Sequence, residues 1–103
     1  MKFNLNDYDH DTVMHCLTEE EAATFCTYLH NAGRRWTGGD SYADITKFST
    51  YGNKTCYYFK SDQFGSIKYA QYYNRRILNF RDFDWSDLAP PEEENPVALR
   101  FTW

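Results

Sequence analysis

The segment from Thr18 to Gly33 constrains the fold most, because it carries a helix-start signal at one end and a helix-stop signal at the other. Thr18 and Glu21 form a capping box: the Thr18 hydroxyl accepts from the Glu21 amide, and Glu21 reaches back to the Thr18 amide. Gly33 suits the left-handed conformation that closes a helix. Apolar residues between these ends recur at helical spacing: Ala22, Phe25, Cys26, Leu29 and Ala32. The sequence therefore predicts an amphipathic helix over about 19–32.

Short β-prone segments, with no second long helix, surround this helix. Strands are expected at 12–17, 55–60, 66–69 and 75–80, with a hairpin turn at 61–65, a short helical turn at 70–74 and, as an option, a last strand at 97–103. This order predicts an α+β domain in which one long helix packs on a small, mostly antiparallel sheet of three to five strands. The tyrosine-rich strands would then leave side chains on the open face of the sheet.

The length of 103 residues fits a single domain, 1–103, with one core. Within it we expect a polar N-terminal lead-in at 1–11 and an acidic C-terminal segment at 82–96. No run of about 20 apolar residues exists to span a bilayer, and the first residues lack the apolar stretch of a signal peptide. The three cysteines include no Cys-x-x-Cys pair, which favours buried thiols in a cytoplasmic protein.

Aromatic side chains are unusually frequent, with eight Phe, nine Tyr and three Trp. Most of them should replace the scarce aliphatic residues in the core. A core of this size cannot bury all of them, so several tyrosines are expected at the surface. Because Tyr and Trp supply much of the contact energy in protein interfaces, this surface minority is relevant to function.

Charge is arranged in three blocks along the chain. Residues 1–33 carry a net charge of −5, residues 34–81 of +6 and residues 82–103 of −5. Either the acidic ends fold back and neutralise the basic centre, or the protein has faces of opposite sign, one of which meets a charged partner.

Motifs that would indicate catalysis or metal binding are missing from the sequence. The glycines match no nucleotide-binding fingerprint, and the Gly-x-Ser-x-Gly elbow is absent. His15 and Cys16 would point to opposite faces of a strand. Cys26 and His30 share a helix face, but Cys26 lies on the apolar stripe, where a core thiol is expected. We therefore expect no enzyme, no cofactor and no metal site.

An acidic–aromatic segment near the C-terminus, residues 82–94, is the first candidate for binding a partner. Carboxylates around an aromatic anchor can occupy a basic groove built for nucleic acid. The candidate partner-binding residues are Asp82, Phe83, Asp84, Trp85, Asp87, Glu92, Glu93 and Glu94. The expected partner is a protein, such as a nuclease or a nucleic-acid-binding complex.

The basic centre, residues 34–81, is the alternative candidate. Cations interleaved with aromatic rings on a sheet are typical of proteins that bind single-stranded nucleic acid. The candidate residues for nucleic-acid or nucleotide binding are Arg34, Arg35, Trp36, Tyr57, Lys68, Tyr72, Arg75 and Arg76. The acidic net charge of the chain and the spread of these cations favour structural roles for many of them.

A set of short motifs between residues 13 and 80 resembles small accessory proteins encoded by tailed bacteriophages. The motifs are a short apolar strand, the Thr-Glu-Glu-Glu-Ala helix closed by Gly33, Trp36-x-x-Gly39, Cys56-Tyr57-Tyr58, Ile67-x-Tyr69, Tyr72-Tyr73 and Ile77-x-x-Phe80. The resemblance implies a phage product in the host cytoplasm. It also implies a non-enzymatic protein that binds and inhibits a host defence enzyme, such as a CRISPR effector, by steric or electrostatic competition. No site residue can be transferred from it.

Overall fold

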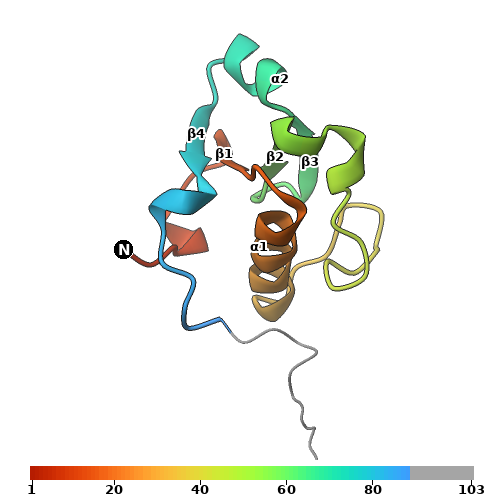
Figure 1. Ribbon diagram of the computed structural model, residues 1–103. Helices are drawn as coiled ribbons and strands as arrows, with labels where there is room; N and C mark the ends of the chain where they lie inside the picture. Colours follow the sequence, from red (N-terminus) through yellow and green to blue (C-terminus); the bar gives the residue numbers. More distant parts are fainter. Residues whose placement is uncertain (89–103) are drawn as a thin grey trace, which may run out of the picture.

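A mixed four-stranded sheet and one principal helix form the framework of the computed structural model, which describes residues 1–88 (Figure 1). The elements are β1 (Thr12–His15), α1 (Glu19–Asn31), β2 (Thr55–Tyr58), β3 (Gln63–Ser66), α2 (Ile67–Tyr72) and β4 (Arg76–Asn79). The strand order is β3-β2-β1-β4. The β1–β2 and β2–β3 pairs are antiparallel, and β1 and β4 are parallel. The α+β class is confirmed; the expected strand at 97–103 lies outside the described residues.

Helix α1 is thirteen residues long and follows the signals at its ends closely. The Thr18 hydroxyl accepts from the Glu21 amide at 3.1 Å. The Glu21 carboxylate reaches back one residue further than predicted, to the amide of Leu17 at 2.8 Å. Gly33 adopts a φ of 84° and its amide donates to the carbonyl of His30, which closes the helix.

The two faces of the sheet have different cover because strand residues alternate between them. Met14 and Tyr57 belong to the main core with the buried stripe of α1. Val13, Cys56 and Tyr58 form a smaller cluster with Ala70 of α2, on the other face. The sequence predicts an open second face. That prediction is wrong for β2, because α2 covers Tyr58 on that face.

The N-terminal segment differs from the expected polar lead-in. Phe3 and Leu5 are buried between exposed polar neighbours. Phe3 lies at the centre of an aromatic cluster, with ring centroids 5.1–5.6 Å from six other rings: Tyr8, Phe25, Tyr28, Phe59, Phe83 and Trp85. The first residues of the described chain are thus part of the main core.

The segment between β3 and β4 shows the largest shift from the predicted boundaries. Strand β3 covers residues 63–66, where the sequence predicts a turn at 61–65 and a strand only from residue 66. Helix α2 begins directly after β3, at residue 67, and replaces most of that predicted strand. The cause is Ser66, whose hydroxyl accepts from the Tyr69 amide and caps α2. Asn74, with a φ of 55°, ends the helical segment and returns the chain to β4 beside β1. The parallel β1–β4 pair results from this crossover.

Of the helices in residues 1–88, none is long and apolar enough to cross a membrane. Cys16, Cys26 and Cys56 are free and buried, as the sequence indicates. Burial raises the pKa of the Cys26 and Cys56 thiols to about 12, so both are protonated at neutral pH.

Candidate interaction surface

Within the acidic–aromatic segment, the aromatic side chains pack against the protein's own core. The Trp85 ring stacks on Phe80 at 4.6 Å with an interplanar angle of 3°, and its Nε1 donates to the Phe80 carbonyl at 2.9 Å. It also packs nearly perpendicular to the rings of Phe25 and Tyr28, with an interplanar angle of 83° to each. Phe83 packs on Phe3. These aromatic residues anchor the segment to the fold, so a partner would meet mainly its carboxylates.

Two of those carboxylates share one cation at the N-terminus. Lys2 Nζ lies 3.0 Å from Asp84 and 3.1 Å from Asp87. Hydrogen bonds from Ser86, together with Lys2, hold the pKa of Asp84 far below its usual range. Asp82 is exposed. Glu92, Glu93 and Glu94 lie outside the described residues.

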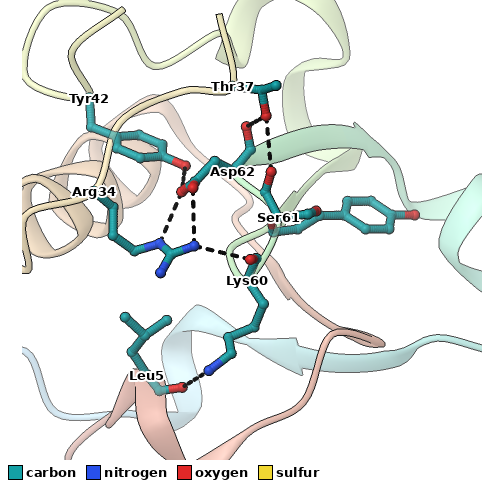
Figure 2. A network of polar contacts seen from close by, with 8 residues as sticks. Leu5, Arg34, Thr37, Tyr42, Lys60, Ser61 and Asp62 are labelled. Atoms are coloured by element: carbon teal, nitrogen blue, oxygen red, sulfur yellow. Dashed lines mark hydrogen bonds and ion pairs between the residues drawn. The ribbon is translucent and has the colours of Figure 1, made fainter. Parts of the chain in front are cut away.

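In the basic centre, Arg34 is committed to a structural network (Figure 2). Its Nε and Nη2 donate to the two oxygens of Asp62 at 3.0 Å each, and Nη2 also donates to the Lys60 carbonyl. The Tyr42 hydroxyl donates to the same carboxylate at 2.9 Å. Figure 2 shows Arg34 and Tyr42 converging on Asp62, which ties the turn after β2 to the end of α1. This arrangement leaves Arg34 engaged within the fold.

Two further members of the alternative site are buried. Trp36 is 3% exposed and Tyr57 is 1% exposed. Their polar atoms are satisfied by the loop at 40–54: Trp36 Nε1 donates to the Ile45 carbonyl, and the Tyr57 hydroxyl donates to the Thr46 carbonyl. Neither ring is accessible to stack on a base. The physical reason is that β2 is an inner strand of the sheet, and that the Trp36 ring packs in the main core against Tyr42 and Phe64.

Arg35 and Arg76 are exposed, and their side chains contact residues outside the alternative site. Arg35 Nη1 donates to the Gly39 carbonyl at 3.3 Å. The Arg76 guanidinium lies 5.1 Å from the centre of the Tyr8 ring, on the N-terminal segment. The structure does not gather the eight predicted residues into one site.

Three exposed tyrosines do gather, on and beside α2. Tyr69, Tyr72 and Tyr73, here called the tyrosine surface, are 52%, 79% and 51% exposed. The Tyr73 ring lies 4.7 Å from Tyr69 and 5.0 Å from Tyr72. Ala70 is the residue of α2 that turns fully inward. Because Ala70 faces the sheet, the rings on either side of it face solvent.

Two predicted cations lie beside this surface. Lys68 is exposed on α2. The Arg75 guanidinium lies 6.0 Å from the ring centres of both Tyr58 and Tyr73, within the range of a cation–π contact. Arg75 also pairs with Asp11. Of the predicted residues, the structure therefore brings together Lys68, Tyr72 and Arg75.

A groove of about 290 Å³ runs from the tyrosine surface along β3. The residues that line this β3 groove are Tyr51, Tyr58, Gln63, Phe64, Gly65, Ser66 and Tyr69. Tyr51 is 43% exposed and comes from the loop before β2. Tyr51 and the groove could not be recognised from the sequence, because they depend on where the loop and α2 lie relative to β3.

Two buried polar atoms near this groove have no hydrogen-bond partner among residues 1–88: the Tyr58 hydroxyl and Arg75 Nε. Tyr58 is 9% exposed, and burial raises the pKa of its hydroxyl, while the charge of the neighbouring Arg75 and its proximity to that hydroxyl lower the pKa by less. The hydroxyl therefore stays protonated at neutral pH. Buried polar groups are normally paired, so these two call for an explanation.

Groups that could carry out chemistry are held in structural contacts. His15 Nε2 lies 2.8 Å from the carbonyl oxygen of Asn53. Burial raises the pKa of the neighbouring Cys16 thiol far above its usual range. In the described part of the chain, no three His, Cys, Asp or Glu side chains are grouped as metal ligands.

No protein family, curated protein or solved structure matches this chain.

Proposed function

We propose that this protein acts without catalysis, by binding a partner protein through the tyrosine surface. The observation that carries the proposal is the group of three contacting, exposed rings of Tyr69, Tyr72 and Tyr73. Tyrosine supplies a large contact area with few rotatable bonds, and it is enriched at the centres of interfaces. A cluster of exposed rings of this kind is what a partner would cover.

The helix that carries the rings is held at both ends, which supports a pre-formed binding surface. Ser66 caps its start, and the Arg75 amide donates to the Ala70 carbonyl at 2.9 Å at its end. Ala70 is buried against Val13 and Cys56. A rigid platform loses little conformational freedom on binding, which favours affinity.

The partner that we propose is a host protein that handles nucleic acids, such as a CRISPR effector, inhibited by steric or electrostatic competition. The resemblance to small phage proteins and the acidic–aromatic segment support this choice. Asp82, Asp84 and Asp87 would steer the protein toward a basic surface, while the tyrosine surface supplies the contact area. Charge of this kind affects mainly the rate of association and its salt dependence.

Direct binding of nucleic acid is the second candidate, because Lys68 and Arg75 lie beside exposed rings. Single-strand binders combine such cations with stacking aromatics. The pairing of Arg75 with Asp11 and the net charge of −4 weigh against it. A gel-shift at low salt separates the two candidates, since retention of DNA or RNA supports only the second.

The test is affinity capture from a bacterial lysate with three forms of the protein: wild type, a Tyr72→Ser/Tyr73→Ser double variant, and Ile45→Ser. Ile45 is an exposed apolar side chain of the loop at 40–54 and serves as the matched control. We expect the wild type and Ile45→Ser to capture the same partner, and the double variant to lose it. Equal capture by all three would refute the tyrosine surface as the contact.

A further inference from the structure

We propose that the β3 groove accepts an extended, acidic segment of the partner protein, which adds to the sheet as a strand beside β3. This inference rests on the proposed function, since it names the kind of segment that the same face would take. It is carried by the free edge of β3, the walls of the groove, the charge around it and the two unpaired polar atoms.

The edge of β3 is open and has little protection. Strand β3 pairs with β2 alone in residues 1–88, and no loop bonds to the backbone of Gln63, Phe64 or Gly65 there. An edge strand presents unpaired N–H and C=O groups, and proteins usually protect it with charged residues or proline. The Gln-Phe-Gly-Ser sequence of β3 contains neither, and its four-residue length is the only protection of this kind that the strand itself provides. Strand β4, at the other edge, carries Arg76.

The walls of the groove leave room for an added strand. Tyr51 and Phe64 lie together on one side, with ring centroids 5.8 Å apart, and Tyr58 and Tyr69 lie on the other. Gly65 leaves the bottom of the groove free of a side chain; a Cβ at this position would lie 3.4 Å from the Tyr58 ring and fill that space. Strand addition of this kind takes its affinity from main-chain hydrogen bonds and its specificity from side-chain pockets.

The charge around the groove favours an acidic segment. The lining itself is uncharged, with no Asp, Glu, Lys or Arg, so the charges that matter are those beside it. Lys68 lies on α2, two residues after Ser66, which lines the groove. Lys54 immediately precedes Thr55, the residue of β2 that pairs with Ser66. The nearest acid along the chain, Asp62, is already bonded by Arg34.

The unpaired polar atoms give a carboxylate something to bind. The Tyr58 hydroxyl and Arg75 Nε are both donors, and they lie under the Tyr69 and Tyr73 rings. Those rings are half-exposed, so access to the two donors requires the rings to rotate on binding while the backbone of α2 stays fixed. The two groups also lie beside each other, and a carboxylate or carbonyl oxygen that entered there could accept from both.

The probes for the test are two short synthetic peptides, in which threonine alternates with glutamate or with lysine, and a single-stranded oligothymidine. Binding is followed by fluorescence anisotropy, and the amides of β3 are followed by hydrogen exchange. We expect the glutamate peptide alone to bind and to protect the amides of residues 63–65. Binding of the oligothymidine in place of the peptide would overturn the proposal and assign the face to nucleic acid. Peptide binding without protection of β3 would overturn strand addition.

Charge variants complete the test. Gly65→Glu and Lys68→Glu should each weaken the glutamate peptide at least about tenfold, because they place a negative charge in or beside the groove. Arg35→Glu makes the same change of charge as Lys68→Glu, on an exposed residue outside the groove lining, and should leave binding unchanged. If partner capture depends on Tyr72 and Tyr73 but not on Gly65 or Lys68, the proposed function stands and this inference fails. If the wild type captures no partner, the proposed function itself fails.

Discussion

Replacement of Trp85 by alanine should destabilise the fold, because the structure makes this residue a core anchor of the C-terminal segment. Its ring stacks on Phe80 and contacts Phe3, Phe25 and Tyr28. Truncation of a buried Trp costs about 3–5 kcal/mol, and each aromatic pair contributes roughly 0.5–1.5 kcal/mol beyond its area. Because Trp85 is only partly buried, we expect a loss of about 3 kcal/mol in the free energy of unfolding.

The assay is urea unfolding followed by circular dichroism, with thermal melting as a second measurement. A loss of about 3 kcal/mol should lower the melting temperature by roughly 10–20 °C in a domain of this size. Tyr72→Ala is the matched control, since its ring is mostly exposed and surface changes usually stay within about 0.5 kcal/mol. A loss below about 1 kcal/mol for Trp85→Ala would refute the role of Trp85 as a core anchor and would make its ring a candidate for contact with a partner.

Three further predictions concern the polar network, pH and the thiols. Asp62→Asn should cost about 2–3 kcal/mol in urea unfolding, because it leaves Arg34 partly buried without its counter-charge; a loss under about 0.5 kcal/mol would contradict this. The pKa of Glu21 is lowered: burial raises it, but hydrogen bonds from the Arg81 side chain and the Leu17 amide prevail. The contribution of Glu21 to the free energy of unfolding is therefore present above its ordinary pKa of about 4.3, and it is lost as the pH falls through the pKa of the folded state. The melting temperature should accordingly fall less on acidification in a Glu21→Gln variant, and an equal fall would count against the contact. Cys26 and Cys56 should resist alkylation at pH 8 until the protein unfolds, and fast labelling of the native protein would refute their burial.

How much of the fold follows from the sequence depends on how local each signal is. Helix α1 is predicted to within a residue because Thr18, Glu21 and Gly33 act on their own neighbours. The parallel pairing of β1 with β4 could not be predicted, because it is a contact between distant segments brought about by α2. Phe3 has the same explanation: a single apolar residue among polar ones gives no period, and its burial depends on six rings, most of them from distant parts of the chain.

The candidate site was predictable only in part, for a similar reason. The excess of tyrosines indicates that some must be exposed, and Tyr69, Tyr72 and Tyr73 confirm it. Which tyrosines these are depends on packing: Tyr57 and Tyr58 are adjacent in β2, and both are buried because each face of that strand is covered.

The central claim is that the tyrosine surface is the face that meets the partner. The most direct measurement is hydrogen exchange of the protein, free and in complex with the partner that the wild type captures. The account predicts slower exchange at residues 63–73, covering β3 and α2, with little change in α1. Slower exchange confined to residues 82–88, with β3 and α2 unchanged, would contradict it.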